Sequence, residues 1–378
     1  MALFTAAQAA RSTLAALRYL SVLPRTVRQD FSEEFVNKKG QTVNVLGPIT
    51  VGEARVYTKA NRTNRDAIQF DDVDEAVYPV KMEDQVYKAL RVPDDFNTFT
   101  LQQAEKQLLI PSARSVVKGL ATPLHNKMQE ISPATEWTVP AVAADGSNIR
   151  AVLIALRQVF SIREVPLEDR FVAVGAGIEA AILSDPQLQK VNESGSDGLL
   201  RRAEMLDLFG FQIVAEPRLP LYFGIAYQRD AFASVTRPSA NPDGAAMSAT
   251  VSQDGYALRW LKHYNASQLE DQSVVDAFVG ADILDPERAA SFSLALIGTS
   301  IVITDDTETI AVGGTFRLEV KDSSGNVIPN RLITFTTSNA GRATVDADGV
   351  VHGVAAGSAA TITATFQTKT DTAAITVS

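Results

Sequence analysis

The sequence predicts an α+β protein that ends in a separate all-β sandwich. A long amphipathic helical stretch covers residues 100–131, and helices and strands then alternate up to residue 297. After Gly298 the composition changes to Thr-, Val- and Gly-rich segments with alternating polarity. The chain has 378 residues, of which 46% are apolar and 21% are charged. These values are typical of a globular protein with two or three domains.

The composition excludes several kinds of site. The chain contains no cysteine, so disulfides, thiol nucleophiles and cysteine-bound metal centres are excluded. Three isolated histidines (His125, His263 and His352) give no metal-ligand spacing, and we expect no metal, cofactor or catalytic set. No apolar run is long enough to span a bilayer, so we expect no membrane partner. Arg11 and Arg18 interrupt the Ala-rich start, which argues against a signal peptide.

The first ninety-nine residues predict an arm followed by a long excursion. Residues 1–40 contain a helix over 5–20 and a highly charged extended arm. Residues 41–99 begin with a strand, continue through a polar, turn-rich stretch, and return in two strand-like segments, 75–82 and 85–92. A two-stranded excursion of this length is marginal in water unless something covers it. We therefore expect a second subunit to cover it.

Charge reverses sign along this part of the chain. Residues 1–65 carry ten Lys and Arg against four Asp and Glu, whereas residues 66–100 carry three against nine. Such a reversal suits a basic segment that lies on an acidic segment of a neighbour. We predict inter-subunit contacts between the two groups, whose members are Arg55, Lys59, Arg62, Arg65, Asp71, Asp72, Asp74 and Glu75.

Residues 100–140 predict the long helix. Apolar residues recur in steps of three or four and keep their phase through Pro111 and Pro123. Thr100 is a candidate N-cap. We expect one helix kinked at both prolines rather than two or three short ones. The apolar stripe is Leu109, Ala113, Val116, Leu120, Leu124, Met128 and Ile131.

Residues 141–297 predict a mixed domain closed by two antiparallel strands. The first helix follows Ser147, a candidate cap. The closing pair is 256–264 with 273–284, after a stretch at 239–255 that we expect to be a loop or hairpin tip. The expected elements between them are a strand at 170–175, helices at 176–183 and 199–209, a strand at 211–215 and strands within 221–235.

Residues 298–378 predict an immunoglobulin-type sandwich. Short alternating strands separated by glycine turns recur at regular spacing. We expect the domain to fold alone and to be mobile relative to the body, so that a chain ending at residue 297 would still assemble. The six expected strands are 300–304, 315–321, 332–337, 350–354, 360–366 and 372–377.

One motif resembles a phosphate-binding turn. Gly175, Gly177 and Ala180 match the G-x-G-x-x-A pattern between a strand and a helix. The acidic residue that should follow about twenty positions later falls in the loop around Glu193 and Asp197. A dinucleotide-dependent cytoplasmic enzyme is therefore kept only as an alternative.

The order of these elements resembles the major capsid protein of tailed bacteriophages, with the Johnson or Hong Kong 97-type fold. The branch assembled with a separate scaffolding protein is the most similar. The resemblance covers about residues 1–290. The segments that carry it are GQTVNVLGP (40–48), VYPVKMEDQVYKALRV (77–92), LIPSARSVVKGLATPLHNKM (109–128) and RFVAVGAGIEAAIL (170–183).

This resemblance implies a part for each segment. Residues 1–40 would be the N-terminal helix and arm, 41–99 the extended loop with strands of the peripheral domain, and 100–140 the spine helix. Residues 141–297 would be the axial domain with the closing peripheral strands. The chain has no room for the insertion domain of some relatives, and no long scaffolding segment precedes the arm.

The C-terminal segment resembles a bacterial immunoglobulin-like domain of group 2. Phe335 stands where that family usually has Trp, which we expect to change core packing rather than the fold. The segments that carry this resemblance are TIAVGGTFRLEVKDSSGNVI (309–328), ITFTTSN (333–339), ATVDADGVVHGVAAGSAATITATF (343–366) and AAITV (373–377).

Together the two resemblances imply a non-enzymatic shell subunit with an external immunoglobulin-like domain. Expected partners are other copies in hexamers and pentamers, a scaffolding protein, a portal, packaged DNA nearby, and a cell-surface ligand for the last domain. The expected location is the virion capsid, and the host cytoplasm during assembly. A surface adhesin is the second alternative.

Overall fold

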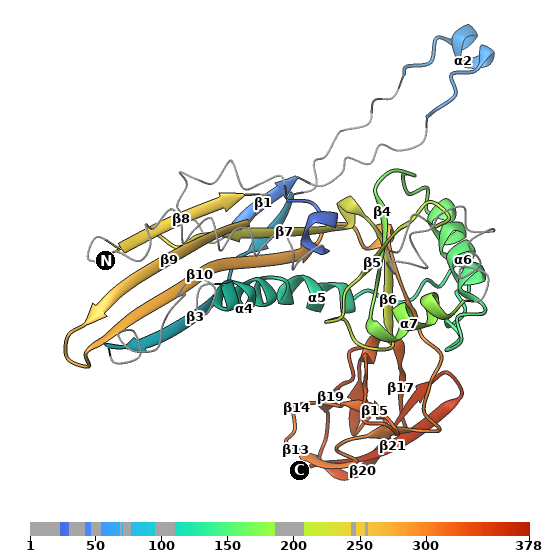
Figure 1. The fold of residues 1–378 in the computed structure, drawn as a ribbon. Helices are drawn as coiled ribbons and strands as arrows, with labels where there is room; N and C mark the ends of the chain where they lie inside the picture. Colours follow the sequence, from blue (N-terminus) through green and yellow to red (C-terminus); the bar gives the residue numbers. More distant parts are fainter. Residues whose placement is uncertain are drawn as a thin grey trace.

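The computed structural model describes most of the chain. Figure 1 shows a long sheet with two helices beside it, a mixed domain, a β domain at the C-terminus and a projecting tip that carries α2. The expected helices at 5–20 and 199–209 lie outside the described residues. The described residues are 23–29, 42–46, 54–68, 70, 77–94, 110–185, 208–242, 247–253 and 256–378.

The long sheet of the peripheral domain is antiparallel. Its order is β3-β10-β9-β8, and β7 also pairs with β10. The expected closing pair, β9 and β10, is confirmed. The stretch 239–255, expected to be a loop or hairpin tip, instead contains a strand, β8, which pairs with β9 along its length. The strands are β3 (Asp84–Pro93), β7 (Phe232–Arg237), β8 (Met247–Gln253), β9 (Tyr256–Asn265) and β10 (Glu270–Ile283).

The spine consists of α4 (Ile110–Leu120) and α5 (Thr122–Gln129), which lie end to end in Figure 1. We expected kinks at both prolines, but the interruption falls at Ala121, and Pro123 occupies the first turn of α5. Proline has no N–H to donate to the preceding turn, so the hydrogen-bond ladder is broken just there. The Ala121 and His125 amides still donate to the Val117 and Ala121 carbonyls, at 3.3 and 3.0 Å.

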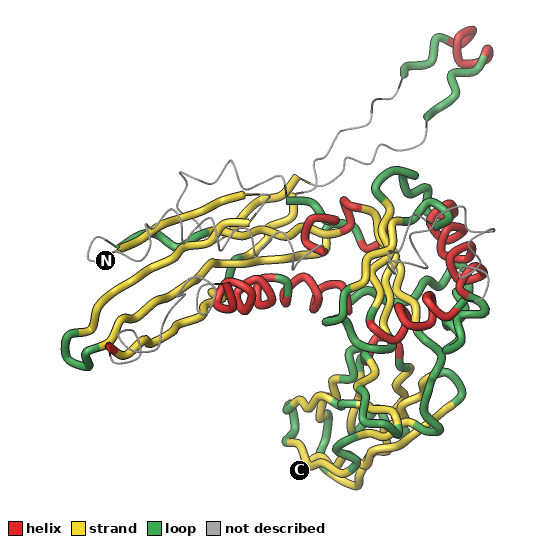
Figure 2. The backbone as a smooth tube through the Cα atoms, viewed as in Figure 1, coloured by secondary structure: helices red, strands yellow, loops and turns green. Residues whose placement is uncertain are grey.

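Pro111 lies at the start of the described part of α4, and the expected helix before it, with Thr100 and Leu109, lies outside the described residues. Figure 2 shows the spine, in red, along the yellow strands of the peripheral sheet. Three side chains of α4, those of Val116, Val117 and Leu120, are buried in a core with Leu258, Trp260, Val275, Ala277 and Val279 of the sheet.

The axial domain is a four-stranded sheet in the order β11-β6-β4-β5. Alternate residues of β4 face opposite sides, because side chains alternate along a strand. Val172 and Val174 belong to a core with the helices α6 and α7, whereas Phe171 and Ala173 belong to a core with α5. The elements are α6 (Ile149–Ile162), β4 (Arg170–Val174), α7 (Ala176–Ser184), β5 (Gln212–Ala215), β6 (Phe223–Gln228) and β11 (Ala289–Ser293).

Ser147 does not cap α6. Its hydroxyl donates to Asp145 Oδ1 at 2.8 Å, and Asn148 occupies the N-cap position without a side-chain cap bond. The Asn148 side chain accepts from the Ala143 amide at 2.7 Å and donates to the Ala141 carbonyl at 2.8 Å. Both polar side chains hold the preceding turn instead, which is a common competing use of Ser and Asn.

Short elements complete the body. The base of the excursion is β1 (Thr42–Leu46) paired antiparallel with β2 (Val77–Lys81), and its buried valines pack against Val235 and Leu284. The N-terminal segment contains η1 (Leu23–Thr26) and runs beside β7 through an amide–carbonyl bond from Arg28 to Phe232. The turn η3 (Arg229–Ala231) directly precedes β7, and the turn η4 (Pro286–Arg288) directly precedes β11.

The C-terminal domain is an all-β domain of three small sheets, in the orders β12-β15-β16, β13-β21-β20-β17 and β14-β19-β18. The strand expected over 315–321 is divided between two of these sheets, and β13, β16 and β18 were not expected. The elements are β12 (Ile301–Ile303), β13 (Thr307–Ile310), β14 (Thr315–Arg317), β15 (Val320–Asp322), β16 (Val327–Ile328), η5 (Asn330–Leu332), β17 (Thr334–Thr337), β18 (Ala343–Val345), β19 (Val350–Gly353), β20 (Gly357–Phe366) and β21 (Lys369–Val377).

A buried pair of ionisable groups lies where the spine meets the axial domain. His125 of α5 and Glu216, just after β5, are both buried, and Nε2 and Oε1 are 3.7 Å apart. Beside them, the Arg218 guanidinium donates to the Lys118 carbonyl and to Thr122 Oγ1. Burial raises the pKa of Glu216, but His125 and Arg218 together outweigh burial and hold this pKa below its usual value.

We predict that Leu120→Ala lowers the free energy of unfolding by about 2–5 kcal/mol, because the Leu120 side chain is fully buried between α4 and the sheet. Denaturant unfolding measures the change. Lys118→Ala, on the exposed side of the same helix, is the control and should have little effect. Equal stability of the Leu120 variant and its parent would contradict the assigned face of α4.

We predict that Glu216→Gln destabilises the chain by roughly 1–3 kcal/mol at neutral pH, because it removes the buried charge beside His125. A carboxylate with a lowered pKa contributes stability above its unfolded pKa, and the contribution is lost as pH falls through the folded pKa. The difference between parent and variant should therefore shrink below about pH 4.5. A pH-independent difference in denaturant unfolding would contradict this assignment.

Candidate assembly surfaces

The tip of the excursion, residues 54–68, folds on itself around a single helical turn, α2 (Lys59–Asn64). Thr58 is the N-cap, and its Oγ1 accepts from the Asn61 amide at 3.3 Å. The Tyr57 hydroxyl donates to the Asp66 carbonyl at 2.7 Å, which joins the two sides of the tip. Arg65 ends the helix in the left-handed conformation, with φ of 57°. Local hydrogen bonds thus hold the tip without help from a core.

Large apolar side chains on this excursion have no cover within the described chain. Phe70 is 90% exposed, Val56 82% and Ile68 65%. Isolated exposed apolar residues are normal on protein surfaces, but a group of them on one projecting segment indicates a contact surface. Figure 1 shows the tip well away from the body, so the body does not cover it.

The structure describes only the basic residues of the predicted charge contact. Arg55, Lys59, Arg62 and Arg65 are all exposed on the tip. Their proposed acidic partners, Asp71, Asp72, Asp74 and Glu75, lie outside the described residues. The contact itself stays a prediction. Sequence reasoning found the basic residues of this surface but missed its apolar ones, although Val56, Ile68 and Phe70 already stand out within a polar stretch.

The glycines of the G-x-G-x-x-A motif serve packing. A Cβ at Gly175 would lie 2.2 Å from the Pro220 carbonyl oxygen, and one at Gly177 would lie 2.7 Å from that of Leu221. The Gly175 amide donates to the Phe223 carbonyl at 3.1 Å. The main chain of residues 220–221 therefore occupies the space beside this turn that a bound diphosphate would need. This geometry argues against the dinucleotide alternative.

The C-terminal domain joins the axial domain through a continuous core. Tyr222 and Leu294 of the axial domain belong to the same buried cluster as Ile301, Ile328 and Phe366 of the C-terminal domain. The element contacts of the C-terminal domain are nevertheless mostly within the domain itself. Its expected mobility relative to the body stays a prediction. Apolar side chains on both sides of the joint would be exposed to water if the domain moved away.

A hydrogen-bonded carboxylate lies at this joint. The Tyr222 hydroxyl donates to Asp322 Oδ2 at 2.6 Å, and the amides of Ser324 and Asn326 donate to Oδ1, each at 2.8 Å. Burial, followed by the Asp322 hydrogen bond, raises the pKa of Tyr222 to about 12. Burial also opposes ionisation of Asp322, but its hydrogen-bond donors prevail and lower the Asp322 pKa. The pair therefore stays a phenol and a carboxylate at neutral pH.

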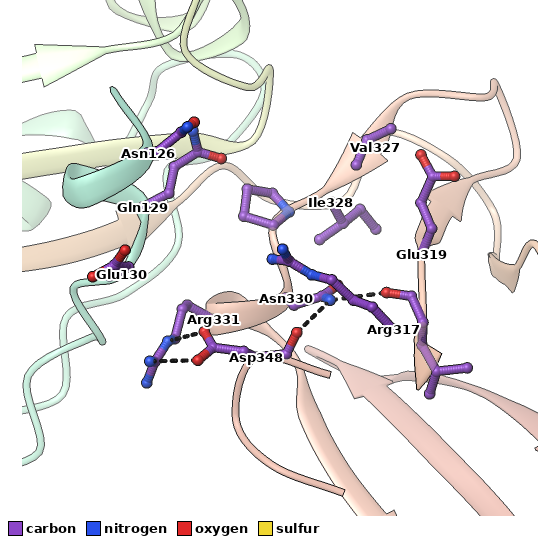
Figure 3. Close-up of a pocket in the computed structure, with 12 residues that line it drawn as sticks. Asn126, Gln129, Glu130, Arg317, Glu319, Val327, Ile328, Asn330, Arg331 and Asp348 are labelled. Carbon is purple, nitrogen blue, oxygen red and sulfur yellow. Dashed lines mark hydrogen bonds and ion pairs between the residues drawn. The ribbon is translucent and has the colours of Figure 1, made fainter. Parts of the chain in front are cut away.

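A cleft of about 610 Å³ separates α5 from the C-terminal domain (Figure 3). Its lining is polar and carries both signs of charge, including Glu130 on the helix and Arg317 on the β domain. Arg331 and Asp348 form a two-pronged ion pair, with Nε–Oδ1 2.5 Å and Nη2–Oδ2 2.8 Å. Asn330 Nδ2 donates to the Asp348 carbonyl at 2.7 Å. These interactions of Arg331, Asn330 and Asp348 join loops within the C-terminal domain.

Neither a metal site nor a membrane-spanning helix occurs among the residues that the structure describes. No group of three His, Asp or Glu side chains there is placed to hold a metal ion. No helix within the same ranges is long and apolar enough to cross a membrane.

Comparison with known proteins gives a family for one part of the chain and a fold for the other. Residues 298–377 match the family model of the bacterial Ig-like domain, group 2. No curated protein sequence matches the chain. A solved structure from Mycobacterium phage Che8 aligns with a TM-score of 0.53 and 14% identity, over 71% of this chain and 89% of that one.

Two phage capsid structures align at a lower score. That of cyanophage P-SCSP1u has a TM-score of 0.47 and 12% identity, over 68% of this chain and 84% of that one. That of Ralstonia phage GP4 has a TM-score of 0.47 and 8% identity, over 73% and 88%. The chain thus combines a body with the Hong Kong 97-type fold of tailed-phage capsid proteins and, at residues 298–377, a domain of the bacterial Ig-like group 2 family.

Proposed function

We propose that this chain is a major capsid protein that self-assembles into the icosahedral shell of a tailed bacteriophage. One observation carries the proposal: a body with the capsid fold extends a tip whose apolar side chains have no cover within the described chain. In a shell, each tip would lie on a neighbouring subunit, and axial domains would meet in hexamers and pentamers. The subunit would act by assembly rather than by catalysis.

The same proposal extends to location and partners. The chain would reside in the virion capsid after assembly in the host cytoplasm, with a separate scaffolding protein and a portal as partners. Packaged DNA would lie nearby without specific contacts, since a net charge of −9 disfavours a dedicated nucleic-acid binder. The Ig-like domain would point outward, because an inward domain would occupy volume needed by the genome. There it could meet a cell-surface ligand.

A surface adhesin is the second candidate function. The observation that favours it is the Ig-like domain. Negative-stain microscopy of the expressed chain distinguishes the two. We expect closed shells of uniform diameter, alone or on co-expression with a scaffolding protein. Monomers or small oligomers under both conditions would contradict the capsid proposal.

We predict that reversing Arg62 and Arg65 to Glu impairs shell assembly while leaving the subunit folded, because both side chains are exposed on the tip. One exposed ion pair contributes only about 0–1 kcal/mol, but a shell repeats it in every subunit. Sedimentation measures the assembled fraction, and circular dichroism checks folding.

Lys369→Glu is the control, because Lys369 is an exposed basic residue at the start of β21, in the Ig-like domain, which lies away from the tip in Figure 1. It should assemble like the parent. Normal shells from the Arg62 and Arg65 double variant would show that the basic residues of the tip take no part in assembly.

A further inference from the structure

The joint between the axial and Ig-like domains is built from specific polar contacts as well as apolar packing. We call the group formed by Tyr222, Asp322, Phe366, Gln367 and residues 294–297 the Tyr222 joint. Its central side chain, Tyr222, is fully buried, and the ring packs edge-on against Phe366 with centroids 5.9 Å apart. The hydroxyl donates to Asp322 and accepts from the Ile297 amide at 3.3 Å. One tyrosine thus contacts the Ig-like domain and the linker together.

Gln367 fixes the linker from the other side. Its Oε1 accepts from the Leu296 amide at 3.1 Å, and its Nε2 donates to the Leu294 carbonyl at 2.9 Å. Gln367 itself sits in the left-handed conformation, with φ of 54°, in the turn between β20 and β21. A flexible tether between domains would have its main-chain groups bonded to water. Here the Leu296 amide and the Leu294 carbonyl bond to the Ig-like domain, whereas the Ile297 amide bonds to Tyr222. Ordering the linker in this way costs chain entropy and fixes its direction.

A second contact reaches the core that α5 shares with the axial sheet. Leu332, at the end of η5, packs against the core formed by the axial sheet and α5, which contains Leu124 and Met128. Leu332 also packs against the core of its own domain. The Ig-like domain therefore contacts the axial sheet at Tyr222 and the spine core at Leu332. The cleft in Figure 3 lies between the same domain and α5.

We infer that the Ig-like domain is a brace within the subunit, held in one orientation by the Tyr222 joint and stabilising the angle between spine and axial sheet. A change in that angle would have to break the Leu332 packing or open the joint, and both expose buried groups. In a shell this angle contributes to the curvature that each subunit imposes. That last consequence rests on the proposed function, whereas the brace is a property of the single chain.

Hydrogen–deuterium exchange with mass spectrometry tests the brace, because amide exchange reports local opening equilibria. Parent and variants are compared in the same assembly state, with peptides covering the linker, 294–299, and α5, 122–129. Tyr222→Phe removes only the hydroxyl. Losing one buried hydrogen bond should speed exchange roughly 5- to 30-fold in both peptides.

Tyr264→Phe is the matched control, because its hydroxyl also donates to an aspartate, Asp94, at 2.8 Å, but on the peripheral sheet. It should leave both peptides unchanged. Leu332→Ala should speed exchange in α5 while the linker stays protected by the Tyr222 joint.

Two results would overturn the inference. Fast exchange of the parent linker would show that the Tyr222 joint does not hold the domain. Unchanged exchange of α5 in both Tyr222→Phe and Leu332→Ala would show that the domain does not stabilise the spine. Neither result depends on shells, so failure of the brace is distinguishable from failure of the capsid proposal.

Discussion

The packing of α5 against the axial sheet is the contact on which the other parts of the subunit depend. Leu124 and Met128 are fully buried there, in a core that also contains Phe223 and Tyr227 of the sheet. Three further segments share this core: the N-terminal segment through Leu23 and Val27, the start of β7 through Phe232, and the Ig-like domain through Leu332. Burial of apolar surface is non-directional, but close packing of one shared core admits few arrangements of its parts.

Polar groups also restrict the orientation in which α5 packs against the axial sheet. His125 of α5 and Glu216 of the axial domain lie beside each other at this contact, with Nε2 and Oε1 3.7 Å apart, and both side chains are buried. Arg218 also bonds to the break between α4 and α5, through the Lys118 carbonyl and Thr122 Oγ1. Tyr222 and Asp322 play the corresponding part at the Ig-like domain.

Within the described residues, the joints between domains are thus closed internally, whereas the excursion leaves apolar side chains uncovered. At the joints, apolar residues are buried and main-chain groups are bonded within the chain. On the excursion, local turns satisfy the main chain around α2, but Val56, Ile68 and Phe70 face water. Under the proposed function both properties would be needed, because the shape of a shell subunit must be fixed before the subunit can impose a curvature. The contacts left open are then available to its neighbours.

The sequence alone determined the elements with strong local signals. The amphipathic stripe gave the buried face of α4 and α5, and glycine turns with alternating residues gave the Ig-like domain. It also predicted the basic residues of the tip. Only the tertiary structure decided where the spine is interrupted, that Ser147 bonds Asp145 rather than the helix, and that 247–253 is a strand. It also decided that Tyr222 and Asp322, a hundred residues apart, meet at a shared core. The Tyr222–Asp322 contact leaves no local pattern, because each residue's partner lies far away along the chain and is brought to it only by folding.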